Sequence, residues 1–124
     1  MSNILFQPRH IAYHLAAEAM DMGGFPIRQL LPADGVEQVD PFLLLHHARI
    51  TVPKGALPLK SGVGPHPHRS FSPVTLIFEG GVHHRDSRGN DHVVEAGGTQ
   101  WMNAGMGIVH SERPPADLAA TGGV

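Results

Sequence analysis

Cysteine is absent from the 124 residues of this chain. Disulfide bonds, thiolate metal ligands and cysteine nucleophiles are therefore excluded. Lysine is scarce, with Lys54 and Lys60 as the only examples, and nine basic residues stand against eleven acidic ones. A formal net charge of −2 without a basic cluster argues against direct binding to nucleic acid or to an anionic membrane.

Long apolar runs are missing as well. No stretch approaches the ~18 apolar residues that a membrane helix needs. The first ten residues also lack the basic segment and apolar run of a secretory signal. There is no G-x-S-x-G elbow, which argues against an α/β-hydrolase, and there is no P-loop and no dinucleotide-binding glycine motif. We therefore expect a cytoplasmic protein without a membrane segment.

Turn-forming residues are abundant instead, with 15 glycines and 11 prolines. They separate short apolar runs at regular intervals, a pattern typical of an all-β sandwich or barrel. The length fits one domain, 1–124. Residues 1–22 have no clear assignment, because 10–20 suits a short helix or a strand, and the small residues of 115–124 indicate a loop or a tail. The expected strands are 27–31, 42–45, 49–52, 74–78, 81–85, 92–95, 99–103 and 108–111.

Histidine is the unusual residue, with ten in the chain. Two pairs have the spacing i and i+2, His66 with His68 and His110 with Glu112, so in extended chain each pair projects to one face. If the two strands are neighbours in a barrel, three imidazoles and one carboxylate converge. This donor set suits a borderline divalent metal: Fe(II), Mn, Co, Ni, Cu or Zn.

Other histidines were weighed as ligands. His84 and Asp86 also share a face with each other, but they lead with His83 into a turn at 87–90, where polar side chains are usually solvated or bound to backbone. A role beside the metal site or at a substrate rim suits His84 better than ligation. His46 and His47 are adjacent, so at most one points inward, for packing or hydrogen bonding. Solvated histidines on a purely structural β-domain remain an alternative to any metal site.

Several motifs in a fixed order resemble the pirin family of the cupin superfamily, over roughly residues 23 to 114. They are HPHR at 66–69, EGGV at 79–82, HRDS at 84–87, QWM at 100–102 and AGMGIVHSE at 104–112. The resemblance implies a cupin-type, jelly-roll-like β-barrel with a metal in its mouth. It also implies that His66, His68, His110 and Glu112 are the ligands, and that Fe(II) is the metal.

The resemblance implies one of two functions. Some pirins are similar to quercetin 2,3-dioxygenases, oxidoreductases that open a flavonol ring with dioxygen. In that case a small aromatic chelating substrate binds the metal, and Glu112 serves as ligand and proton acceptor. Other pirins are non-catalytic, iron-dependent regulators or bind partner proteins. We expect the dioxygenase, with the regulator as the alternative.

The length departs from that family, whose members usually have two barrels and about twice as many residues. The resemblance therefore implies a single barrel that is incomplete in this chain. An open strand edge favours pairing with another copy. One expectation is a homodimer in which the second copy completes the barrel, and the alternative is a fragment that folds poorly.

Overall fold

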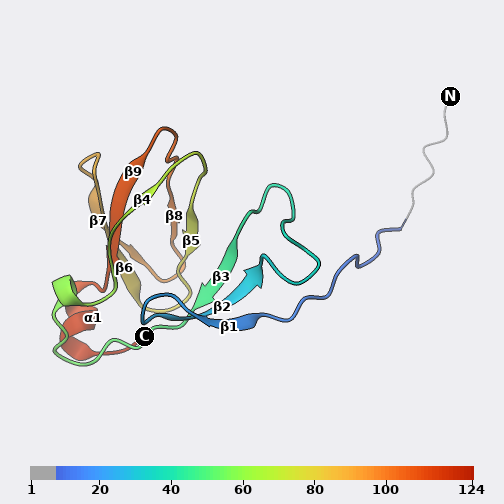
Figure 1. Cartoon of the computed structure of the whole chain (residues 1–124). Helices are drawn as coiled ribbons and strands as arrows, with labels where there is room; N and C mark the ends of the chain where they lie inside the picture. The colour runs from blue at the N-terminus through green and yellow to red at the C-terminus, as the bar shows by residue number, and fades with distance from the viewer. Residues whose placement is uncertain (1–7) are drawn as a thin grey trace. The chain divides into compact units, whose positions relative to one another are not determined.

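A computed structural model describes residues 8–124, in which strands predominate (Figure 1). The chain divides into two compact units, the first ending at Arg49 and the second running from Ile50 to Val124. No helix in the described residues has the length and apolar character needed to cross a membrane. The single domain expected over 1–124 stays a prediction, and part of the unassigned segment 1–22 lies outside the described residues.

The first unit contains a three-stranded antiparallel sheet in the order β1-β2-β3. Its strands are β1 (Glu18–Asp21), β2 (Pro26–Leu31) and β3 (Leu45–Ala48). Ile27 and Leu31 of β2 are buried. Of the two options for residues 10–20, the helix does not form, and extended chain leads into β1.

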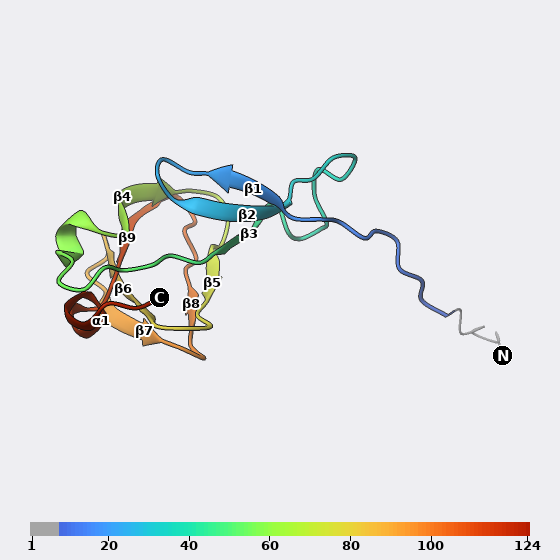
Figure 2. The ribbon, with the colours of Figure 1, turned by 90° about the horizontal axis from the view of Figure 1, so that it is seen from below.

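The second unit carries two antiparallel sheets. One has four strands in the order β4-β9-β6-β7, and the other is the pair β5-β8. Figures 1 and 2 show the pair on the opposite side of the unit from the four-stranded sheet. The elements are β4 (Val63–His68), β5 (Val74–Leu76), β6 (Gly81–Asp86), β7 (Asp91–Glu95), β8 (Thr99–Trp101), β9 (Ile108–Arg113), a 3-10 turn η1 (Pro58–Lys60) and the helix α1 (Ala116–Thr121).

Strand β4 lies at the edge of the four-stranded sheet and contains two prolines, Pro65 and Pro67. Proline cannot donate to a strand ladder, so an edge strand is where it is tolerated. Each proline also fixes its own φ and restricts the residue before it. The two histidines of β4 are thus presented by a stiff, extended segment.

The interior of the second unit is partly apolar and partly polar. Met102, Ala104 and Ile108 form its buried hydrophobic cluster. His84, Gln100 and His110 are also buried. Polar side chains at such positions need partners, because an unpaired buried polar group costs ~1–3 kcal/mol. The polar half of the interior is where the candidate site lies.

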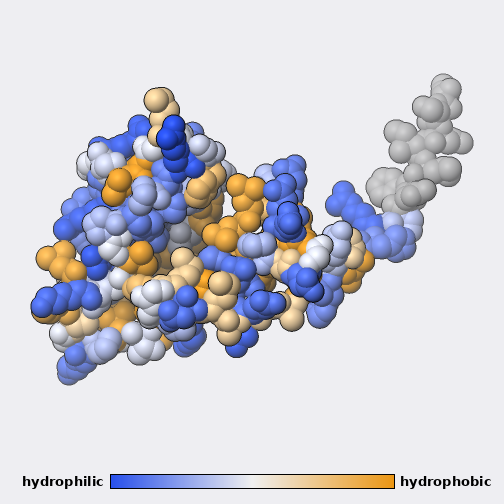
Figure 3. Space-filling model, in the orientation of Figure 1, coloured by the Kyte–Doolittle hydropathy of each residue, from blue (hydrophilic) through white to orange (hydrophobic). Residues whose placement is uncertain are grey.

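The two sheets of the second unit do not join into one closed sheet. Large apolar side chains remain exposed in this unit, among them Phe78, Trp101 and Met106. The space-filling view shows hydrophobic patches among hydrophilic surface on the face that it displays (Figure 3). The predicted all-β fold with an incomplete barrel is confirmed.

The C-terminal segment differs from the prediction of a loop or tail. Residues Ala116–Thr121 form α1, and Gly123 then pairs with Val52 in an antiparallel bridge. The helix ends where Gly122 takes a φ of 76° and donates its N–H to the Leu118 carbonyl. Small residues suggested a tail because they carry little periodicity. The burial of Ala119 and a hydrogen bond from the Gly55 N–H to the Ala119 carbonyl stabilise a helix that sequence alone does not mark.

Candidate metal centre

Three histidines meet on the inner face of the four-stranded sheet. Strand β4 pairs with β9 so that His66 lies directly opposite His110, and His68 follows two residues along β4. One ring nitrogen from each histidine lies within 4.8 Å of the other two. The Nε2 atoms of His68 and His110 are 3.1 Å apart. His66 contacts the Gly64 carbonyl through Nδ1 at 2.8 Å, which leaves its Nε2 as the atom available to bind a metal ion.

The surroundings favour neutral imidazoles, the form that binds metal. His110 is 3% exposed. Burial, followed by the neighbouring rings of His66, His68 and His84, lowers the pKa of His110 to about 4. Burial and His66 also lower the pKa of His68, against an opposing effect of Glu112. A metal ion therefore meets neutral rings at these two positions near neutral pH.

Glu112 lies beside the three histidines but is not a member of that close group. Its Oε1 accepts a hydrogen bond of 2.9 Å from Gln100 Nε2 and a longer contact of 3.5 Å from Thr75 Oγ1. Gln100 and Thr75 belong to β8 and β5, so the pair of strands opposite the sheet holds this carboxylate. Of the four predicted ligands, the structure brings three together and places the fourth next to them. Metal ligation by these residues stays a prediction.

Gln100 and Thr75 were not predicted to belong to the site. They come from β8 and β5 and carry no ligand-type spacing. Gln100 was visible only as part of the QWM motif. Its buried Oε1 has no hydrogen-bond partner among the described residues, so the side chain acts on the site through its amide nitrogen.

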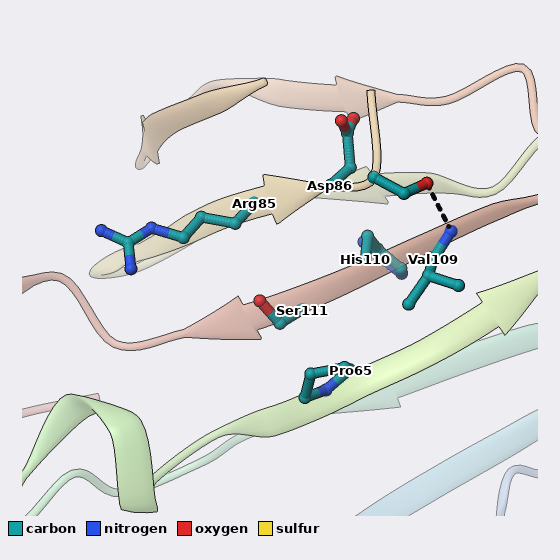
Figure 4. Close-up of a pocket in the computed structure, with 7 residues that line it drawn as sticks. Pro65, Arg85, Asp86, Val109, His110 and Ser111 are labelled. Carbon is teal, nitrogen blue, oxygen red and sulfur yellow. Dashed lines mark hydrogen bonds between the residues drawn. The ribbon is translucent and has the colours of Figure 1, made fainter. Parts of the chain in front are cut away.

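The place of His84 and Asp86 before a turn predicted side chains that are solvated or bound to backbone. Neither side chain is solvated, and Asp86 accepts hydrogen bonds from the backbone N–H groups of Arg88 and Asn90. Strand β6 pairs with β9 so that Asp86 lies opposite His110 and His84 opposite Glu112. The side chains of both residues are 2% exposed. Figure 4 shows Asp86 and His110 on adjacent strands, with Arg85 projecting away from Asp86. The alternation along β6 thus places both residues on the inner face that bears the three histidines.

A continuous chain of contacts links these residues. Nδ1 of His110 lies 3.4 Å from Nδ1 of His84, and Nε2 of His84 lies 3.0 Å from Oδ2 of Asp86. Asp86 also accepts hydrogen bonds from the backbone N–H groups of Arg88 and Asn90 and from the Asn90 side chain. Burial alone would raise the pKa of Asp86, but the hydrogen bonds from Asn90, His84 and Arg88 outweigh it and hold the pKa well below its usual range. The carboxylate is therefore ionised.

The remaining histidines have other surroundings. His83 is on the opposite face of β6 from His84 and pairs with the exposed carboxylate of Asp91. His46 contacts the Gln29 Oε1 at 3.0 Å, which confirms the hydrogen-bonding role expected for one member of the 46–47 pair. Burial lowers the pKa of His46.

A hollow of about 450 Å³ opens beside His84 and Asp86. His84 and His92, whose ring centroids are 5.1 Å apart, line one part of it. Gln100, Trp101 and Met102 line another. The hollow has room for a small planar ligand, next to residues that contact the metal-ligating candidates.

Comparisons with known proteins identify the family of this chain. The family described as Pirin matches residues 24–124. The chain belongs to the pirin family. A pirin-like protein of Solanum lycopersicum is 36% identical over 115 residues, which make up 92% of this chain and 37% of the relative.

Two solved structures share the fold. A quercetin 2,3-dioxygenase from Acinetobacter baumannii has a TM-score of 0.72 and 37% identity, over 88% of this chain and 38% of the other. The bacterial pirin YhhW from Escherichia coli, in complex with nickel(II), has a TM-score of 0.59 and 30% identity, over 80% of this chain and 42% of the other. The predicted cupin-type fold is thus confirmed. The chain spans little more than a third of the length of the first relatives it matches.

Proposed function

We propose that this chain is a metal-dependent pirin that opens the ring of a flavonol, such as quercetin, with dioxygen. The observation that carries the proposal is the group of three histidines, with one nitrogen each within 4.8 Å of the others. The family membership and the similarity to a quercetin 2,3-dioxygenase support the same reaction class.

The donor set fits a divalent metal ion. His66, His68 and His110 supply imidazole nitrogens, and Glu112 supplies a carboxylate oxygen beside them. Imidazole suits Fe, Ni, Cu and Zn, and carboxylate broadens the set to Mn. We propose Fe(II), because this redox-active metal would activate dioxygen and imidazole is among its preferred ligands. The bound metal would polarise the hydroxyl and neighbouring carbonyl of a chelated flavonol and lower the pKa of that hydroxyl.

Glu112 is the proton acceptor in this proposal. Among the described residues, hydrogen bonds to its carboxylate reach only Oε1, so Oε2 is left to take a proton or a metal ion. The hydrogen bond from Gln100 fixes the orientation of the carboxylate. A positioned acid–base group of this kind contributes typically ~10²–10⁴-fold to a rate.

The first test is metal binding. Protein purified without oxygen should bind one Fe(II), and a free metal concentration about 100 times the Kd should raise the free energy of unfolding by ~2.7 kcal/mol. His66→Ala should lose both the metal and the stabilisation. His83→Ala removes an imidazole from the opposite face of the sheet and should keep both.

The second test is turnover. The Fe(II) protein should consume quercetin, followed by loss of the flavonol absorbance and by oxygen uptake. Glu112→Gln preserves the side-chain volume and should lower the rate by at least ~10²-fold. Stoichiometric metal with no loss of quercetin above this variant would reject the dioxygenase. It would leave the non-catalytic regulator as the function of the site.

A further inference from the structure

The buried contacts that link Asp86, His84 and His110 restrict where the protons of the two imidazole rings lie. The ionised Asp86 only accepts hydrogen bonds, so the 3.0 Å contact requires a proton on Nε2 of His84. In a neutral imidazole the other nitrogen is an acceptor. Nδ1 of a neutral His84 accepts, and Nδ1 of His110 at 3.4 Å must then donate to it. His110 is left with a lone pair on Nε2, the atom that faces His68.

We propose that Asp86 and His84 are positioning residues that set the tautomer of His110, so that its Nε2 lone pair is turned toward the metal before any metal binds. The purpose of this device rests on the proposed function. The tautomers themselves are a property of the metal-free protein. Metal-ligating histidines usually donate their second N–H to a carboxylate or carbonyl, and here a second histidine relays that effect.

The same reasoning orders the other two rings. His66 contacts a backbone carbonyl through Nδ1, so this nitrogen carries the proton and Nε2 has the lone pair. His68 differs, because its Nε2 lies 3.1 Å from an Nε2 of His110 that can only accept. His68 must donate in that contact. It is thus the ring that has to move its proton from Nε2 to Nδ1 in order to bind metal through Nε2.

Asp86→Asn is a nearly isosteric substitution that should reverse the hydrogen-bond donors and acceptors along Asp86, His84 and His110. Two backbone N–H groups, from Arg88 and Asn90, point at Oδ1 and will keep the amide oxygen there. The amide nitrogen then replaces Oδ2, which accepts hydrogen bonds from both His84 and the Asn90 side chain. The Asn90 amide can turn its oxygen toward the new nitrogen, and that nitrogen donates to His84 Nε2. His84 must shift its proton to Nδ1, and His110 must shift its proton to Nε2, which removes the lone pair on the metal side.

Asp91→Asn is the matched control. Asp91 also pairs a carboxylate with a histidine of β6, but with His83 on the outer face. It is exposed and receives an additional hydrogen bond from Arg85. This substitution makes the same chemical change but leaves the contacts between Asp86, His84 and His110 unaltered.

The experiment is nitrogen-15 NMR of the histidine rings in metal-free protein at about pH 8, above the ordinary histidine pKa of ~6.5. We expect Nδ1–H tautomers for His66 and His110 and Nε2–H tautomers for His68 and His84. Asp86→Asn should reverse His84 and His110, and Asp91→Asn should reverse neither. The affinity for Zn²⁺, measured by calorimetry, should fall ~10–100-fold in Asp86→Asn. It should be unchanged in Asp91→Asn.

A second pair of variants covers the case in which Asp86→Asn does not fold. His84→Gln preserves the direction of the chain, since its amide nitrogen donates to Asp86 and its oxygen accepts from His110. His84→Met offers neither group. We expect His84→Gln to retain the Nδ1–H tautomer of His110 and most of the Zn²⁺ affinity, and His84→Met to lose both.

Three results overturn the inference: a proton on Nε2 of His110 in the metal-free protein, a His84 protonated on both nitrogens, or an unchanged His110 tautomer in folded Asp86→Asn or His84→Met. The expected tautomers without any Zn²⁺ binding would instead reject the proposed metal site and leave the positioning of the His110 proton intact.

Discussion

Acidification should destabilise the metal-free protein through His110 in particular. The folded-state pKa of His110 is about 4, whereas an unfolded histidine has a pKa near 6.5. The unfolded chain therefore binds more protons between these two values. The stability that neutral, buried His110 contributes is complete above about pH 6.5 and is lost as the pH falls toward about 4. The full shift corresponds to about 3 kcal/mol, most of it lost by about pH 4.5.

Urea unfolding of chelator-treated protein at about pH 7.5 and about pH 4.5 measures this loss. His110→Gln removes the titrating ring and its repulsion of His66, His68 and His84. The variant should be less stable than the wild type at the higher pH. Its further loss on acidification should be smaller than that of the wild type by about 2–3 kcal/mol.

His14→Gln is the control, because this ring is exposed. It should retain the pH dependence of the wild type. Equal losses in His110→Gln and the wild type would refute the reasoning, since the burial of His110 would then carry no penalty for its charged form.

Two further predictions concern the framework around the site. Ile108→Ala removes a side chain that is 5% exposed in the buried cluster and should lower the free energy of unfolding, measured in urea, by ~2–5 kcal/mol. Val109→Ala, at a position 43% exposed, should lower it by less than ~1 kcal/mol. Equal losses would contradict the assignment of Ile108 to the inner face. Gly80→Ala places a methyl group on the Val124 carbonyl at a φ of 66°, whereas Gly89→Ala meets open space at a φ of 89°. Gly89→Ala should lower the free energy of unfolding by ~1–2 kcal/mol through its backbone conformation alone, and Gly80→Ala should lower the melting temperature further. Equal melting temperatures would show that the C-terminal segment moves away from the added methyl group without cost.

Part of the site is readable in the sequence because it depends on short-range geometry. The i and i+2 spacing of His66 with His68, in a segment stiffened by proline, predicts that the two rings share a face, and the structure confirms it. The turn residues between apolar runs likewise predict β-strands. The identity of the metal as Fe(II), the cytoplasmic location and the pairing with a second copy stay predictions.

Strand register decided the rest. The sequence places His84 and Asp86 beside a turn, and only the pairing of β6 with β9 sets Asp86 opposite His110 and buries both. A local pattern cannot specify which strands become neighbours, because that choice depends on burial and hydrogen bonding between segments far apart in the chain. Gln100 entered the site for the same reason.

The amino-acid sequence thus determined the strand-rich fold and the histidine pairs, since alternation along an extended chain is a property of each segment. The tertiary structure alone decided which groups hold His110 and Glu112. Their hydrogen-bond partners come from other strands, and their burial exists only once the sheets have assembled.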